Sequence, residues 1–278
     1  MEDLTLVKKT LKLYLICVVC FSIVLEAVYI ATSGITPILI LVLMWVPGAT
    51  AIFISKKYFK KQNILGLRKS KFRYIAASIL IPAAYLLISY GICWICLRDS
   101  YSGIDVLTGP IKQAYGTDLP DFIILIIIIV IGFISSCASA AGEEIGWRGF
   151  MYPAMEKVWD RKRALLISGI IWALWHMPLI ISGLYQSKTA LWYGLIMFTI
   201  EIVGISIILS WLRTVSNSIW PAVFLHAAHN IFDQAVFQII TSHKYSAYFA
   251  GEQGFVTIII VVLIALTGII LWKRKEQG

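Results

Sequence analysis

Eight apolar segments divide this sequence, and each is long enough to cross a membrane. They cover approximately residues 12–32, 35–55, 74–97, 121–147, 164–182, 190–212, 217–241 and 255–272. About 20 helical residues, rising about 1.5 Å each, span the roughly 30 Å of hydrocarbon in a bilayer, and lipid leaves no other partner for the backbone groups. The first segment lacks the cleavage site of a secretory signal, so we expect it to be retained. The sequence predicts an all-α polytopic membrane protein with about eight transmembrane helices, forming a single integral membrane domain over residues 1–278.

The composition and the placement of charge support this prediction. The chain is 59% hydrophobic with a mean hydropathy of +0.84, and 14% of its residues are charged, against about 25% in soluble domains. Its net charge of +9 does not indicate nucleic acid, because juxtamembrane Lys and Arg face anionic lipid headgroups. All but four of the 24 Lys and Arg lie on one side of the predicted spans, the exceptions being Arg98, Lys112, Lys188 and Lys244. The positive-inside rule therefore predicts that both termini are cytoplasmic.

Residues 98–120 form the longest connection between predicted spans. Gly103, Gly109, Pro110, Gly116 and Pro120 occur within it. Because Gly and Pro interrupt regular structure, we expect a polar, irregular loop on the outer face.

The fourth apolar segment ends in charge. Charged groups inside spans usually face the protein interior and mark a functional path. Glu144 and Arg148 are four residues apart and can pair on one helix face, whereas Glu143 points about 100° away from Glu144. The preceding small-residue run 135–142 would let another helix approach closely. We expect Glu144 and Arg148 to be structural and Glu143 to be a general base, the alternative being an ion pair at a cytoplasmic helix end with Glu143 solvated.

Two later segments contribute imidazole and amide groups. His176 lies about 18 Å into the fifth segment, where a buried packing histidine is the alternative interpretation. His226 and Asn230 share one helix face at four-residue spacing. Two donors on one face suit a developing oxyanion. His229, three residues after His226, also leaves open a metal site with two histidines or a polar clamp between helices.

These motifs, in this order, resemble those of the CAAX-protease and bacteriocin-processing (CPBP, or Abi) family of intramembrane proteases, which includes the Ras-converting CAAX endopeptidase. The motifs here are Glu143-Glu144-x-x-x-Arg148, Trp172-x-x-x-His176 and His226-x-x-x-Asn230, and the resemblance covers approximately residues 121–235. The eight-span layout is similar to that family's. Trp172 stands where the family has Phe, an exchange that we expect to affect only local packing.

The resemblance implies a role for each matching residue. Glu143 and His176 would orient and deprotonate water, and His226 and Asn230 would stabilise the tetrahedral oxyanion. Glu144 and Arg148 would brace the site, and the catalytic core would cover approximately residues 121–241. No Ser or Cys stands out as a nucleophile, since the small-residue run is explained by packing.

The resemblance leaves a metal ion as an alternative, because family members are often called metalloproteases. Zinc would take two histidines and one carboxylate, and the matching set is Glu143, His176 and His226. Glu144 would then have to act as the base and would lose its pairing with Arg148. The chain also has no His-Glu-x-x-His helix. We therefore expect no tightly bound metal, with zinc as the alternative.

The sequence thus predicts an intramembrane endopeptidase that hydrolyses a peptide bond of a membrane-associated peptide or protein, of the CAAX type or the bacteriocin or pheromone type. Its Lys- and Ile-rich composition favours a bacterial cell membrane. The expected partners are substrate and lipid, without nucleic acid; substrate identity and oligomeric state stay open. One alternative is a proton- or ion-coupled transporter with a relay through Glu26, Glu143, Glu201 and the histidines. Another is a non-catalytic bacteriocin-immunity protein.

Overall fold

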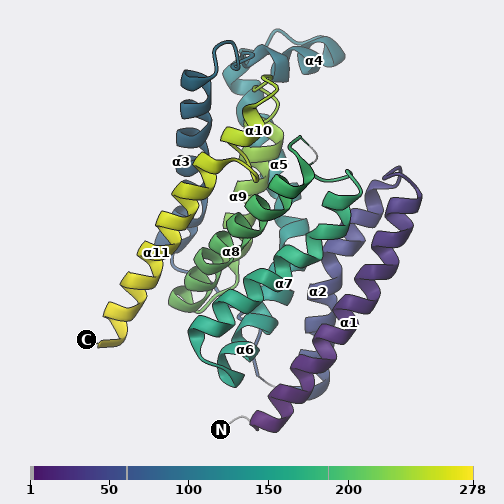
Figure 1. The fold of residues 1–278 in the computed structure, drawn as a ribbon, viewed down its shortest axis with the longest axis vertical. Coiled ribbons are helices and arrows are strands. Elements are labelled where there is room, and N and C mark those ends of the chain that lie inside the picture. The colour runs from purple at the N-terminus through teal and green to yellow at the C-terminus, as the bar shows by residue number, and fades with distance from the viewer. Residues whose placement is uncertain (1–2, 61, 187, 278) are drawn as a thin grey trace.

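Helices build the protein, as its hydropathy predicts. The computed structural model describes residues 3–60, 62–186 and 188–277 (Figure 1). The long helices are α1 (Leu4–Ala31), α2 (Pro37–Tyr58), α3 (Phe72–Cys96), α5 (Asp121–Glu144), α7 (Arg161–Ile181), α8 (Leu191–Ser216) and α11 (Phe255–Gln277). The shorter elements are α4 (Asp105–Tyr115), the π-helix η1 (Ile145–Met151), α6 (Tyr152–Val158), α9 (Trp220–Asn230), the π-helix η2 (Ile231–Phe237) and α10 (Ser246–Phe249). The protein is an all-α, multi-pass integral membrane protein.

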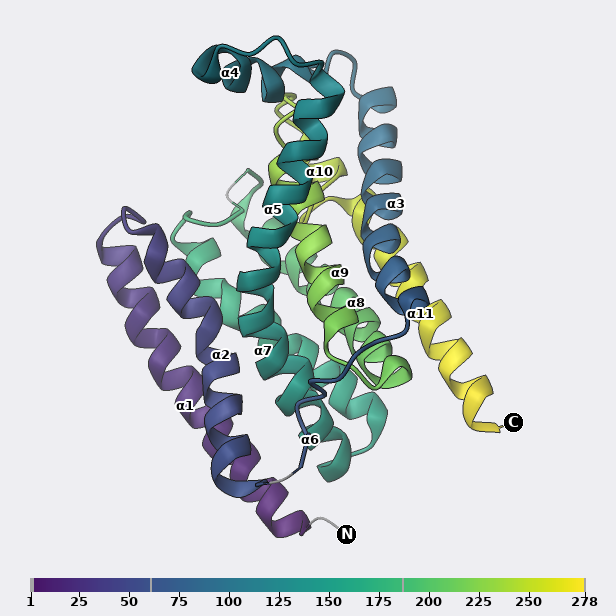
Figure 2. The ribbon, with the colours of Figure 1, turned by 180° about the vertical axis from the view of Figure 1, so that it is seen from behind.

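The connection at residues 98–120 differs from the prediction of an irregular loop. It contains α4, which lies at the end of the molecule remote from the N-terminus (Figure 2). Lys112 forms an ion pair with Asp121 at 2.9 Å, and the Thr108 hydroxyl donates to the same carboxylate. Gly116, with φ of 58°, ends the helix in the left-handed conformation. The prediction was wrong because Gly and Pro were treated as breakers, whereas contacts with the start of α5 stabilise this helix.

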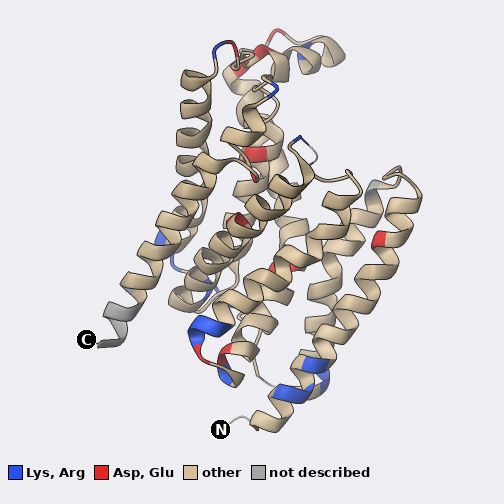
Figure 3. Ribbon diagram, viewed as in Figure 1, with Lys and Arg blue, Asp and Glu red and all other residues tan. Residues whose placement is uncertain are grey.

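The predicted spans coincide with helices of unequal length. Within the described residues, six helices are long and apolar enough to cross a membrane: α1, α2, α3, α7, α8 and the continuous helix of α5, η1 and α6. The helix formed by α9 and η2, residues 220–237, is not among these six, and the apolar part of α11, Phe255–Ile270, is shorter. The count of eight and the cytoplasmic termini therefore stay predictions. In Figure 3, Lys and Arg gather mainly toward the end where α1 begins.

Small residues allow α2 and α5 to approach closely just before the charged motif. A Cβ added to Gly142 would lie 2.7 Å from the backbone oxygen of Met44 and 2.8 Å from Cγ of Trp45. The Trp45 indole also donates to the carbonyl of Ala138 at 3.0 Å. The run 135–142 thus meets α2, in agreement with the close approach expected from its composition. This contact fixes the end of α5, where the two glutamates lie.

We expect Gly142→Ala to destabilise the protein because the added methyl group meets backbone that cannot rotate away. Overpacking costs about 1–3 kcal/mol, and each kcal/mol lowers the Tm of a chain of this size by about 2–4 °C. The Tm in detergent should therefore fall by about 2–12 °C. Gly91→Ala in α3 is the matched control, since its added Cβ meets no atom within 4 Å. Its Tm should stay constant or rise slightly. Equal Tm values for the two variants would contradict the close contact between α2 and α5.

Candidate active site

The end of α5 carries a buried ion pair. Glu144 is 0% and Arg148 1% exposed, and Arg148 Nη1 lies 2.9 Å from Glu144 Oε1. This is the pair predicted from their four-residue spacing. Neighbouring Glu143 is equally buried, at 1% exposure, and does not share the pair. Because an unpaired charge is costly in an apolar interior, the pairing is what permits Arg148 and Glu144 to remain charged there.

His226 on α9 joins the same carboxylate. Its Nδ1 lies 2.9 Å from Glu144 Oε1. A carboxylate can only accept when ionised, so Nδ1 carries the proton and Nε2 is directed elsewhere. Glu144 thereby links α5, η1 and α9 through one oxygen atom, which fixes the position of His226 relative to Glu143.

Trp172 of α7 contacts most of the predicted site. Its indole Nε1 donates to Glu143 Oε2 at 2.8 Å. The guanidinium carbon of Arg148 lies 4.0 Å from the ring centroid, and the His226 ring meets Trp172 edge-on at 5.4 Å. The expectation that Trp in place of Phe alters only packing is therefore wrong. Phe has no N–H group, so the exchange adds a donor that holds one oxygen of Glu143.

His176 is oriented by the backbone one turn earlier. Its Nδ1 lies 2.8 Å from the Trp172 carbonyl oxygen. Because a carbonyl only accepts, Nδ1 donates, and Nε2 carries the free lone pair when the ring is neutral. Tyr185 stacks on the ring at 5.8 Å and Phe198 meets it edge-on at 5.2 Å. His176 therefore has a fixed tautomer and a fixed plane.

One cavity of about 560 Å³ brings the four predicted catalytic residues together. Its lining includes Glu143, His176, His226 and Asn230 from α5, α7 and α9. Apolar side chains of α2 and serines of the small-residue run complete much of the wall: Ile40, Leu41, Leu43, Met44, Ser135, Ser136 and Ser139. The serines thus face the cavity as well as allowing close packing. The arrangement can hold a water molecule and a peptide carbonyl between an acid, imidazoles and an amide.

Several features of the site had no signal in the sequence. Tyr185 and Gln234 also line the cavity, although neither belongs to a recognised motif. Two of the three helices that carry motifs, α5 and α9, also continue as π-helices: η1 begins directly after Glu144, and η2 directly after Asn230. Such wide turns often occur at functional sites. The sequence did offer one indication of the hydrogen bond to Glu143: Trp172 stands where the family has Phe, and an indole has an N–H donor that Phe lacks.

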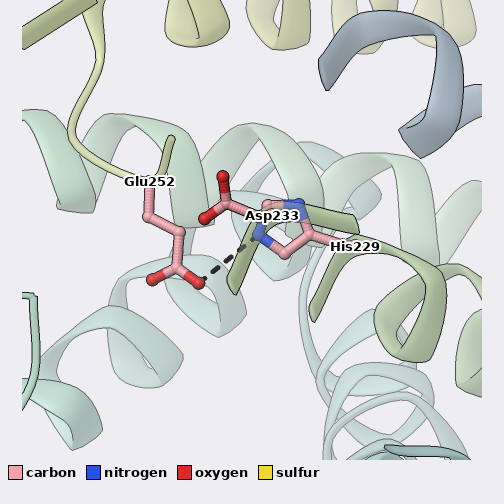
Figure 4. A group of neighbouring side chains, drawn as sticks. All are labelled: His229, Asp233 and Glu252. Carbon is pink, nitrogen blue, oxygen red and sulfur yellow. Dashed lines mark ion pairs between the residues drawn. The ribbon is translucent and has the colours of Figure 1, made fainter. Parts of the chain in front are cut away.

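The zinc alternative does not fit this geometry. The ligand atoms of Glu143, His176 and His226 are not a group within 4.8 Å of one another. Among the described residues, the group that meets this distance is His229, Asp233 and Glu252 (Figure 4). We therefore derive no catalytic step through a metal at the predicted set.

The two other acids considered from the sequence lie apart from the cavity lining. Glu26 and Glu201 are buried, at 4% and 0% exposure. Within the described part of the chain, Glu26 Oε1 and both oxygens of Glu201 have no hydrogen-bond partner. Neither residue lines the cavity that contains Glu143 and the two histidines.

Comparison with known proteins gives the same assignment as the motifs. Residues 121–232 match the family model described as type II CAAX prenyl endopeptidase Rce1-like. CAAX prenyl protease 2 of Methanococcus maripaludis is 34% identical over 98 residues, which are 34% of this chain and 36% of the relative. The chain thus aligns with about a third of that relative's length. The region matched by the family model contains all four residues predicted to be catalytic. Over this Rce1-like region, the chain is similar to the CAAX prenyl endopeptidases, as its motifs predict.

Proposed function

We propose that the protein is an intramembrane endopeptidase of the CAAX type that hydrolyses a peptide bond with water activated by Glu143 and His176. The observation that carries this proposal is the single cavity lined by Glu143, His176, His226 and Asn230. The name of the archaeal relative, CAAX prenyl protease 2, supports the same substrate class. A protease also explains why acid, imidazole and amide groups from three helices lie around one space.

In the proposed mechanism Glu143 accepts a proton from water. The Trp172 indole holds Oε2, and the hydrogen bonds of the described residues leave Oε1 free to face the cavity. His176 Nε2 has a lone pair and orients the same water. The water oxygen attacks the carbonyl carbon, and the proton held by Glu143 passes to the nitrogen of the leaving amine.

His226 and Asn230 would stabilise the oxyanion. Because Nδ1 of His226 donates to Glu144, Nε2 can donate only when the ring is an imidazolium. Glu143, Glu144 and Arg148 together carry one net negative charge when ionised, so an imidazolium makes the cluster neutral. When Glu143 takes the proton, the oxyanion carries the negative charge in its place. The total charge of the buried site then stays constant during attack, which avoids the cost of adding charge to an apolar interior.

The cavity wall suits a substrate that stays associated with lipid. The α2 side chains that line it are apolar, whereas the polar groups are on α5, α7 and α9. A peptide could therefore place its apolar portion along α2 and its scissile carbonyl toward Glu143. We propose a prenylated C-terminal peptide as the substrate. The transporter relay receives no such support, because Glu26 and Glu201 do not line this cavity.

Glu143→Gln should lower kcat/KM for a prenylated CAAX peptide by at least about 10²-fold, because the base is lost. Gln retains an oxygen that accepts from Trp172, so the Tm should change little. The measurement is cleavage by the purified protein in detergent, followed by mass spectrometry. Glu26→Gln is the control: it changes a buried glutamate that does not line the cavity, and activity should stay within about twofold. Cleavage by Glu143→Gln at the wild-type rate would refute the assigned base.

The same assay tests the substrate class. Wild-type protein should cleave the prenylated peptide faster than the identical peptide without the lipid. Equal rates for the two peptides would show that the lipid is not recognised. Absence of cleavage of both, with an unmodified membrane peptide cleaved instead, would reject the CAAX assignment but retain the endopeptidase.

Trp172→Phe should lower kcat by about tenfold, since a hydrogen bond to a charged group contributes about 1.5–3 kcal/mol and only part is expressed in the transition state. KM should change little, because the indole N–H is directed at Glu143 and not at substrate. Trp94→Phe is the matched control: it removes an indole donor that bonds to Thr241, outside the cavity. A rise in KM with constant kcat would show that Trp172 contacts substrate instead of positioning the base.

A further inference from the structure

A second buried cluster lies outside the proposed catalytic machinery. His229 on α9, Asp233 on η2 and Glu252 in the turn before α11 point toward one another (Figure 4). They are 4%, 0% and 2% exposed. One ligand atom from each lies within 4.8 Å of the others. This spacing is compatible with three ligands around one ion, because each bond to a zinc ion is about 2.0–2.2 Å long.

The imidazole presents its free nitrogen to the two carboxylates. Nδ1 of His229 is 2.5 Å from the Tyr85 hydroxyl. Among the described residues Nε2 is buried and has no hydrogen bond, and its 3.5 Å contact with Glu252 Oε1 is an ion pair only when the imidazole is protonated. A metal-bound histidine commonly donates its other N–H to a fixed partner, and Tyr85 occupies that place. When the ring is neutral, the lone pair of Nε2 faces the carboxylates without a donor, and a cation would be its natural complement.

Both carboxylates are also oriented from outside the cluster. Asp233 accepts from the Tyr90 hydroxyl and from the Gln238 amide, each at 2.8 Å. This outer support for the aspartate leaves a lone pair on each oxygen. The backbone of Gly251 packs against the aspartate: a Cβ added to this glycine would lie 3.3 Å from Asp233 Oδ1.

Glu252 is supported in the same way from the side of the catalytic cavity. It accepts from the Tyr185 hydroxyl at 2.5 Å and from the Gln234 amide at 2.8 Å. Both donors line the catalytic cavity, and Tyr185 stacks on His176. The cluster therefore lies next to the proposed active site but uses different residues.

The charge balance of the cluster favours a cation. Glu201 is fully buried, neither of its oxygens has a hydrogen bond to any residue that the structure describes, and its charge is repelled by those of Glu252 and Asp233. The ion pairs of the described residues give none of these three acids a Lys or Arg partner. Glu252 has His229 as an ion-pair partner only when that imidazole is protonated. Buried carboxylates without a permanent positive partner are costly, and a divalent ion would neutralise two of them.

We propose that His229 Nε2, Asp233 and Glu252 bind one divalent transition-metal cation, for which Zn²⁺ is the best match. One imidazole nitrogen and two carboxylate oxygens are ligands that zinc accepts, and a water molecule would complete four-fold coordination. A cavity of about 20 Å³ lined by Tyr90, Gly251 and Glu252 adjoins the cluster, enough for about one water-sized species. The ion would join η2 to the turn before α11. A zinc requirement for activity would then not by itself place zinc in the catalytic cavity.

The test measures zinc in the full-length protein purified in detergent, incubated with Zn²⁺ and desalted. We expect wild type and Glu143→Gln to retain about one zinc per chain, by inductively coupled plasma mass spectrometry. Asp233→Asn and His229→Ala should lose it, whereas His243→Ala, which changes a histidine outside the cluster, should keep it. The Tm of wild type should rise with zinc concentration, and that of Asp233→Asn should not.

Tyr85→Phe provides a second measurement if the other variants do not fold. It removes only the hydroxyl at His229 Nδ1, and the affinity for zinc should fall about 10–100-fold. Unchanged affinity would contradict the proposal. It would also fail if wild type retained no zinc and showed no Tm shift, or if zinc were lost in Glu143→Gln and kept in Asp233→Asn. Peptide cleavage by a protein without zinc would leave the proposed protease function intact.

Discussion

The proposed active site depends on one carboxylate oxygen, which binds two positively charged or hydrogen-bonding side chains inside the membrane protein. Glu144 Oε1 accepts hydrogen bonds from Arg148, in the continuation of its own helix, and from His226 on α9. Charge at this depth is tolerated only when it is paired, so the two contacts limit how the helices can move apart. Small residues that bring α2 against α5 complete the constraint. Because the contact between Glu144 and His226 holds α5 and α9 together, Glu143, His226 and Asn230 face one cavity.

Trp172 orients the side chains of Glu143 and His176. Its indole fixes one oxygen of Glu143, its carbonyl fixes the tautomer of His176, and its ring lies against Arg148. A single residue thus sets the direction of both groups that would act on water. Each contact uses a different part of the residue, which is why replacement by another aromatic side chain changes more than the packing.

The predictable parts of the molecule are those set by local pattern. Apolar length predicts the helices, and the spacing of Glu144 and Arg148 predicts their ion pair. Other features depend on contacts between distant segments. The helix at residues 105–115 is held by Asp121, and the indole of Trp172 bonds to Glu143 across 29 positions. The group of His229, Asp233 and Glu252 depends on a turn that no motif marks. The catalytic roles, the number of spans and the bacterial source stay predictions.

The two π-helices make the active site depend on residue count as well as residue identity. Each wide turn contains one residue more than an α-helical turn would need, immediately after Glu144 and after Asn230. Loss of one residue from the stretch 145–147, between Glu144 and Arg148, would rotate the chain that follows by about 100° and shorten it by about 1.5 Å. Arg148 would then leave its carboxylate although every motif residue was still present. Relatives that differ in length at these two places would therefore need a compensating change to keep the same geometry.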